Sequence, residues 1–223
     1  MCLALLALAA HPRYPLVLAA NRDEFHARPT APASWWMDAF LAGRDLLAGG
    51  TWLGVRRDGR FALLTNIREP HRNNPAAPSR GSLVTALLDD DGELVETMRH
   101  VVVGATGHNG FNLLAGSHRC AVWGSNRIEG VKRLSAGVHG LSNAQLDTPW
   151  PKVERTRAAV TSWAARGDDG FEALWAALAD RVLAADAGLP KTGVSLDWER
   201  ILSAPFIVSE TYGTRCSTIR YRR

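Results

Sequence analysis

The stretch that most constrains the fold is the amino-terminal one, which contains two apolar runs. Residues 2–10 and 16–21 are almost entirely apolar, and His11-Pro12 lies between them. Apolar runs of this length between turn residues are typical of strands that are buried on both faces. The first run resembles part of a signal peptide, but it is short and lacks a positively charged start. We therefore expect two buried strands here.

The composition is that of an ordinary globular protein. The chain has 223 residues, of which 46% are apolar and 22% charged, and no linker or repeat divides it. This length favours one large domain over residues 1–223. No apolar stretch approaches the roughly 20 residues of a membrane span. The net charge of +4 comes from scattered arginines, which disfavours a nucleic-acid partner and suits a small anionic molecule.

The cysteines and histidines indicate no disulfide framework and no metal. Cys2, Cys120 and Cys216 are odd in number and form no C-x-x-C pair, so a zinc ribbon is not expected. Reduced thiols favour a cytoplasmic location. The seven histidines show no ligand spacing, and there is no haem-attachment motif. We therefore predict no metal and no cofactor. The sequence does not indicate the oligomeric state.

Further along the chain, strand-like and helix-like segments come in separate blocks. Asp58-Gly59 separates two strand-like segments and predicts a hairpin, and residues 68–81 form a polar, proline-broken loop. Such blocks favour an α+β fold with largely antiparallel sheets, in which two sheets lie between helical layers. The expected strands are 51–57, 60–66, 111–115, 121–125, 137–141, 206–209 and 217–221, and a turn at 212–214 is expected between the last two. The expected helices are 83–88, 94–103 and one after Pro151. A further helix is expected with Phe171, Leu174, Trp175, Leu178 and Val182 on one face.

Cys2 is the first candidate for chemistry because of its position. An initiator Met before a small residue is commonly removed, which would leave Cys2 as the amino-terminal residue. Its α-amine would have a pKa of about 7.7–8.0 and its thiol one of about 8.5. One residue would then supply both a nucleophile and a general base. The alternative is a small apolar residue at the start of a strand.

Four polar residues, Asn21-Arg22-Asp23-Glu24, follow the second apolar run directly. If the two strands pair as a hairpin, these residues return beside Cys2. There Arg22 can stabilise a thiolate and Asp23 can hold the α-ammonium. The alternative is a solvated charged turn. Polar groups next to a buried strand are costly unless they are satisfied, which favours a functional role.

An ordered set of motifs gives the chain a resemblance to the NRDE family, also called the transport and Golgi organisation protein 2 family. The set extends from one end of the chain to the other and comprises Cys2, Asn21-Arg22-Asp23-Glu24, Gly49-Gly50-Thr51-Trp52-Leu53-Gly54, Thr65-Asn66, Ser79-Arg80-Gly81, Leu141-Ser142-Asn143 and Tyr212-Gly213-Thr214-Arg215-Cys216-Ser217-Thr218. That family is similar to the cholylglycine hydrolase and penicillin V acylase branch of N-terminal-nucleophile hydrolases. The resemblance implies their four-layer αββα fold.

The resemblance also implies a set of catalytic residues, namely Cys2, Arg22, Asp23, Asn66, Asn143 and Arg215. Arg22 and Asp23 are adjacent here, whereas the hydrolases space them further apart, and neighbours on a strand point to opposite faces. Asn66 and Asn143 can donate to an oxyanion, or they can be turn residues. Arg215, between two predicted strands, can bind a carboxylate as a planar fork.

Two further residues are predicted to contact a substrate. Trp52 can line an apolar groove, although packing is its alternative role. Arg80 belongs to the polar loop that can line the mouth of a site.

Two functions are compatible with these residues. The first is a cysteine amidohydrolase or acyl-transfer enzyme that acts on a small amide or thioester. The second is a carrier that binds haem or an acyl-lipid-like ligand without chemistry. The resemblance supports the carrier because eukaryotic members of the family are linked to haem trafficking and acyl-lipid metabolism. A carrier would not need a free Cys2 amine.

Overall fold

A computed structural model describes residues 2–118 and 120–222. The contacts between its residues divide the chain into two compact units whose segments alternate along the sequence. The first unit comprises Met1–Ala27, Arg68–His71 and Ser135–Arg223, and the second comprises Arg28–Ile67 and Arg72–Leu134. Each unit is described below by itself. The single domain over residues 1–223 stays a prediction.

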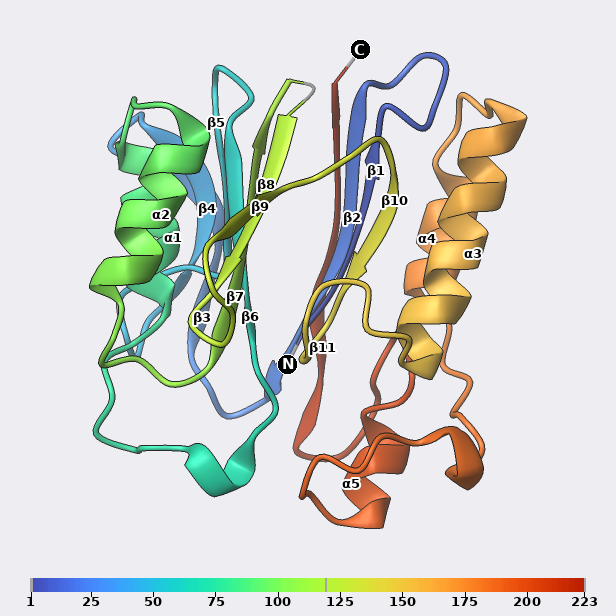
Figure 1. Ribbon diagram of the computed structural model, residues 1–223. Coiled ribbons are helices and arrows are strands. Elements are labelled where there is room, and N and C mark those ends of the chain that lie inside the picture. Colours follow the sequence, from blue (N-terminus) through green and yellow to red (C-terminus); the bar gives the residue numbers. More distant parts are fainter. Residues whose placement is uncertain (1, 119, 223) are drawn as a thin grey trace. The chain divides into compact units, whose positions relative to one another are not determined.

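The first unit is a four-stranded antiparallel sheet with helices on one face (Figure 1). The strand order is β10-β1-β2-β11, with β10 Gly137–Leu141, β1 Cys2–Leu8, β2 Leu16–Phe25 and β11 Tyr212–Arg222. Helices α3 (Pro151–Arg166) and α4 (Glu172–Leu178) cover the sheet. Every residue of β1 is buried, as is β2 as far as Asn21, which confirms the two strands expected from the apolar runs.

Alternation along β1 decides which residues meet the helices. Leu3, Leu5 and Ala7 pack with Val160 and Trp163 of α3 in one apolar cluster. Because successive side chains of a strand point to opposite faces, Cys2 and the other even-numbered residues of β1 point to the face away from α3. The start of α3 is fixed by Pro151, whose preset backbone suits the first turn of a helix.

The second unit is a seven-stranded antiparallel sheet with α1 (Gly81–Asp89) and α2 (Leu94–Gly104) on one face (Figure 1). Gly59 turns the β5–β6 hairpin at a φ of 90°, a left-handed conformation that glycine adopts without strain, so the Asp58-Gly59 prediction is confirmed. The strands lie in chain order and are β3 Thr30–Trp36, β4 Phe40–Asp45, β5 Leu53–Arg56, β6 Phe61–Asn66, β7 Phe111–Ser117, β8 Cys120–Ser125 and β9 Val131–Arg133.

The α+β class with antiparallel sheets is confirmed. Sequence analysis missed β3, β4 and β9, and also the short helices η1 (Pro70–Arg72), η2 (Asp186–Gly188) and α5 (Leu196–Ile201). These are short or half-exposed elements whose apolar pattern is weak. None of the described helices is long and apolar enough to cross a bilayer.

Three predictions near the carboxyl end were wrong. The predicted helical face at 171–182 is cut short, because α4 ends at Leu178 and leaves Trp175 and Val182 exposed. Residues 206–209 form only an isolated bridge, Val208 to Gly213. The predicted turn at 212–214 is instead the start of β11, which pairs with β2 from Phe25 back to Leu16. The long partner strand, and not local turn chemistry, decides the conformation there.

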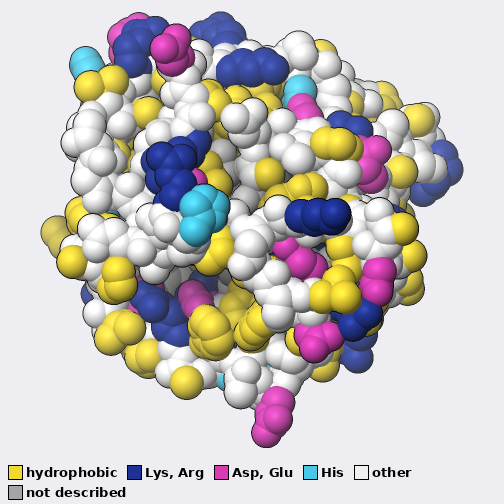
Figure 2. All heavy atoms as spheres, turned by 60° about the horizontal axis from the view of Figure 1, so that its bottom comes forward, with side chains coloured by type: hydrophobic (Ala, Val, Ile, Leu, Met, Phe, Trp, Pro, Cys, Tyr) yellow, Lys and Arg dark blue, Asp and Glu magenta, His cyan; other side chains and the backbone are white. Residues whose placement is uncertain are grey.

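Charged side chains of both signs are interspersed on the surface. On the face that Figure 2 shows, Lys and Arg side chains lie among Asp and Glu side chains. Several arginines pair with a nearby carboxylate, as Arg200 does with Asp186 at 2.6 Å and Arg56 with Asp91 at 2.6 Å. The positive net charge is therefore spread out, as the sequence suggested.

Candidate active site

The register of the first unit's sheet sets the positions of the candidate residues. Cys2 of β1 lies opposite Arg22 of β2, and Cys216 of β11 lies opposite Arg22 from the other side. Residues directly opposite each other in antiparallel strands share a face. The two thiols therefore flank Arg22 on one face of the sheet, while Asp23 points to the helix-covered face.

The Cys2 thiol is enclosed by the protein. The residue is 8% exposed, and burial raises the pKa of its thiol, while Arg22 and a hydrogen bond from the backbone N–H of Asp23 oppose that rise. Ser142 donates its hydroxyl to the Cys2 carbonyl at 3.0 Å, which ties the start of β1 to the segment after β10. A thiol with a raised pKa needs a nearby base before it can act as a nucleophile.

Asp23 lies beside the amino side of Cys2. Because β1 and β2 are antiparallel and Cys2 pairs with Arg22, the backbone nitrogen of Cys2 lies on the side of this pair where Asp23 follows Arg22. The Asp23 Oδ1 accepts a 2.6 Å hydrogen bond from the Thr214 hydroxyl, and its Oδ2 lies 4.0 Å from Lys152 Nζ. Burial raises the pKa of the Asp23 carboxyl, and Lys152 lowers it. The sheet thus places a buried carboxylate on the side of the Cys2 backbone nitrogen. In a chain that begins at Cys2, this nitrogen would be the α-amine.

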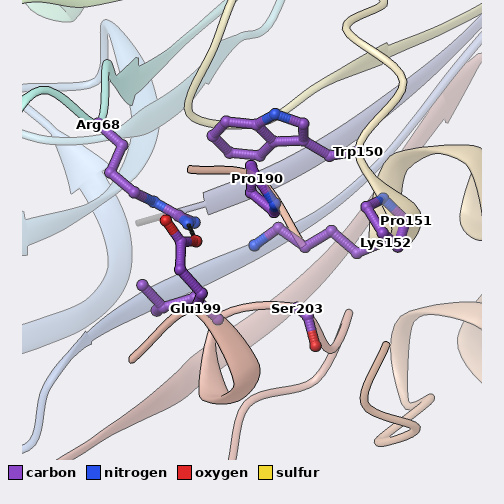
Figure 3. Close-up of a pocket in the computed structure, with 8 residues that line it drawn as sticks. Arg68, Trp150, Pro151, Lys152, Pro190, Glu199 and Ser203 are labelled. Carbon is purple, nitrogen blue, oxygen red and sulfur yellow. Dashed lines mark hydrogen bonds and ion pairs between the residues drawn. The ribbon is translucent and has the colours of Figure 1, made fainter. Parts of the chain in front are cut away.

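Next to this carboxylate the first unit contains a small pocket (Figure 3). Arg68 forms a buried ion pair with Glu199 at 2.6 Å and lies 4.6 Å from the centre of the Trp150 ring. The Lys152 side chain points into the pocket, towards Arg68 and Glu199. The volume open to the centre of a water molecule is about 10 Å³, which is the room that one water needs. The lining residues are Arg68, Trp150, Pro151, Lys152, Pro190, Glu199, Leu202 and Ser203.

Asn143 is connected to both the pocket and Cys2. It is 1% exposed, its carbonyl accepts from the Arg68 backbone N–H at 2.8 Å, and its Oδ1 lies 3.2 Å from the Ser142 hydroxyl, whose one proton it shares with the Cys2 carbonyl. Since the same hydroxyl contacts the Cys2 carbonyl, Asn143 is fixed two hydrogen bonds away from the nucleophile's backbone.

Arg215 occupies a different position from the one expected. It lies inside β11, as the extra residue of a bulge between Thr214 and Cys216, and not between two strands. Its guanidinium donates to the carbonyls of Phe25 and His26, at 2.9 and 3.2 Å. These contacts fasten β11 to the chain that follows β2, and the role of Arg215 in binding a carboxylate stays a prediction.

Three of the predicted residues belong to the second unit. Asn66 ends β6 and pairs with Phe111. The Arg80 guanidinium donates to the Gly110 carbonyl at 3.0 Å, and the Trp52 carbonyl accepts from the Leu64 N–H at 2.8 Å. Their catalytic and substrate-binding roles stay predictions. The first unit by itself brings together Cys2, Arg22, Asp23 and Asn143.

A family model for Transport and Golgi organisation 2 matches residues 1–221. The chain belongs to the Transport and Golgi organisation 2 family. A bovine Transport and Golgi organization protein 2 homolog is 35% identical over 226 residues, which cover 92% of this chain and 81% of that protein. The mouse homolog is 39% identical over 152 residues, or 63% of this chain, and the match spans about half (54%) of the mouse protein.

A solved structure is also similar to this family member. It is the Caenorhabditis elegans N-acylethanolamine-hydrolyzing acid amidase (NAAA) ortholog, with a TM-score of 0.48 and 10% sequence identity, over 79% of this chain and 85% of that one. Within the Transport and Golgi organisation 2 chain, no group of three or more His, Cys, Asp or Glu side chains suited to a metal gathers among the residues that the structure describes.

Sequence reasoning missed three residues that the structure adds to this site in the Transport and Golgi organisation 2 chain. They are Arg68, Lys152 and Glu199, all of them buried in the pocket. One signal for Lys152 was available, because it follows Pro151 in the first turn of a predicted helix. A cation is disfavoured there by the helix dipole, so its presence calls for a tertiary carboxylate partner.

Proposed function

We propose that this family member is a cysteine N-terminal-nucleophile hydrolase or acyl-transfer enzyme that acts on a small amide or thioester. One observation carries the proposal: Cys2 lies opposite Arg22, and the backbone nitrogen of Cys2 lies on the side of this pair where the buried Asp23 follows. A mature chain that begins at Cys2 would have its α-amine beside that carboxyl. Nucleophile, base and a group that orients the base would then be adjacent.

In the proposed reaction the α-amine accepts the thiol proton. The Cys2 sulfur attacks the substrate carbonyl carbon, and a C–S bond forms while the carbonyl oxygen takes the negative charge. The C–N bond of an amide, or the C–S bond of a thioester, then breaks, and the leaving group takes the proton from the α-ammonium. Water hydrolyses the resulting acyl-cysteine thioester in a second round that regenerates the thiol.

The other residues stabilise charge at each step. Arg22 opposes the burial penalty on the thiolate, as a neighbouring cation does for reactive cysteines. Asn143 has an amide held in place by Ser142, and a fixed amide N–H is a suitable oxyanion donor. Asp23 orients the α-amine by accepting hydrogen bonds from those of its N–H protons that are not transferred.

The test uses acyl thioesters of N-acetylcysteamine and simple N-acyl amides of short and long chain length. Intact mass first establishes whether the purified protein begins at Cys2. We expect the wild type to gain the acyl mass on Cys2 and to release the free acid, and Cys2→Ala to lose both. Cys216→Ser is the matched control, because Cys216 also lies opposite Arg22, and it should keep both.

Two results contradict the proposal. If Met1 is fully retained, the amine cannot serve as the base. If Cys2→Ala turns over the same probes at the wild-type rate, the nucleophile is another group. Binding of haem or an acyl probe that survives Cys2→Ala, without turnover in the wild type, would favour the carrier instead.

A further inference from the structure

Lys152 is the one buried lysine and has no role in the steps above. The chain contains three lysines, Lys132, Lys152 and Lys191, and only Lys152 is buried, at 1% exposed. Its Nζ has no hydrogen-bond partner among the residues that the structure describes. Long cationic side chains normally extend their charged ends to water, but this one points into the pocket (Figure 3). A buried ammonium at this position needs an explanation.

The surroundings of the Lys152 ammonium are mostly unfavourable to its charge. It lies in the first turn of α3, where the helix dipole disfavours a cation. Arg68, another cation, lines the same pocket, and Glu199 is already engaged by Arg68 and by two hydrogen bonds from Thr192. The group that offsets these costs is Asp23, whose Oδ2 lies 4.0 Å from Nζ.

The same pair lies beneath the start of β1. Asp23 is held on its other oxygen by Thr214, and the register directs the amino side of Cys2 towards it. We infer that Lys152 is a positioning residue: its ammonium keeps Asp23 ionised on the helix-covered face of the sheet, so that Asp23 can hold the α-ammonium of a mature Cys2. This inference rests on the proposed function and adds to it a residue of α3.

The charges around Lys152 are consistent with this role. Burial lowers its pKa to about 8, which Asp23 and the Cys2 thiolate oppose and Arg68 reinforces. These groups come from β2, β1 and the segment at residues 68–71, and Glu199 of α5 lines the same pocket. At neutral pH Lys152 is therefore mostly charged and can neutralise Asp23. Without it, burial would favour the protonated carboxyl, which holds an ammonium less well.

The experiment uses the small number of cysteines in the chain. Protein labelled with ¹³C-cysteine shows three cysteines in NMR spectra, and the Cα and Cβ signals of Cys2 report the titration of its α-amine and thiol. We expect Asp23→Asn and Lys152→Met each to lower the α-amine midpoint by roughly one pH unit. In the Asp23→Asn background Lys152→Met should add little. Lys191→Met, a change at an exposed lysine, is the control and should not move the midpoint.

The outcomes separate the two proposals. Met1 retained in the intact mass would overturn the proposed function, and this inference with it. Suppose that Met1 is removed but Lys152→Met does not move the α-amine midpoint, or moves it equally in the wild-type and Asp23→Asn backgrounds. Either result would overturn the role of Lys152 alone. If Lys152→Met fails to fold, ¹³C-lysine titration of the wild type and Asp23→Asn replaces it. The midpoint of Lys152 should then fall on loss of Asp23, and an unchanged midpoint would refute the inference.

Discussion

The buried pair of Lys152 and Asp23 predicts a measurable pattern in protein stability. Removing one partner of a buried ion pair typically costs about 3–5 kcal/mol, because the other charge is left uncompensated. Lys152→Met and Asp23→Asn should each lower the free energy of unfolding at neutral pH by about this amount. Their side chains are 1% and 0% exposed, so water cannot screen the remaining charge. The double variant should be much more stable than the sum of the two losses predicts.

The dependence on pH gives a second, independent signature. Burial lowers the pKa of Lys152 from 10.5 to about 8. Below pH 8 the lysine is charged in both states and the native state bears the desolvation cost. Above pH 10.5 it is neutral in both states and the cost is absent. The wild type should therefore gain stability relative to Lys152→Met as pH rises from 8 to 10.5, by on the order of 3 kcal/mol at 1.36 kcal/mol per pKa unit.

Urea unfolding followed by tryptophan fluorescence, at about pH 7 and about pH 10, measures both quantities. Comparison with Lys152→Met removes the contribution of the other groups that titrate in this range. Lys191→Met, at an exposed position, should match the wild type at each pH. Two results would refute the idea that Asp23 compensates a buried ammonium. One is that the losses of the two single variants add up in the double variant. The other is that the free energy of unfolding of Lys152→Met changes with pH between about 7 and about 10 as the wild type does.

Two further predictions concern arginines. Burial raises the pKa of both the Cys2 and Cys216 thiols, and Arg22 opposes that rise. Arg22→Gln should therefore slow their alkylation near neutral pH by up to about tenfold. Equal slowing at Cys120, in the second unit, would show that the effect does not come from the contact with Arg22. Arg215→Lys keeps the charge but loses a guanidinium fork that donates to two carbonyls. It should therefore lower the free energy of unfolding, measured in urea, by about 1 kcal/mol. Weaker ligand binding with unchanged stability would instead support the predicted carboxylate site.

The elements that sequence analysis placed correctly have strong local signals. The two apolar runs predict β1 and β2 because strands buried on both faces read as near-continuous apolar segments between turn residues, and both are almost fully buried. Asp58-Gly59 predicts its hairpin because the turn needs a residue in the left-handed conformation, which Gly59 supplies. Elements whose conformation depends on a distant partner were missed or misread. Thr214 is extended because it pairs with Asp23, far away in sequence, and no local pattern carries that information.

The candidate site divides in the same way. Cys2 and Arg22 could be connected from sequence, because a hairpin of two adjacent strands brings the end of the second strand back to the start of the first, and their register confirms it. The expectation that Arg22 and Asp23 point to opposite faces also followed from strand geometry alone. The residues that contact Asp23 on the helix-covered face could not be predicted, since Lys152 reaches Asp23 only when α3 packs on the sheet.

The adjacency of Arg22 and Asp23 then has a functional reading. An arginine and an aspartate that served the thiol from one face would have to be two residues apart or more, as side chains on a strand alternate. Here the arginine shares the face of the thiol, while the aspartate reaches only the backbone end of Cys2 and is balanced from the other side by Lys152. Asp23 is thus placed to act on an amine, not on a sulfur. A buried acid in that position has a use in a chain that begins at Cys2 and little use in one that does not, which makes the amino terminus of the mature protein the decisive measurement.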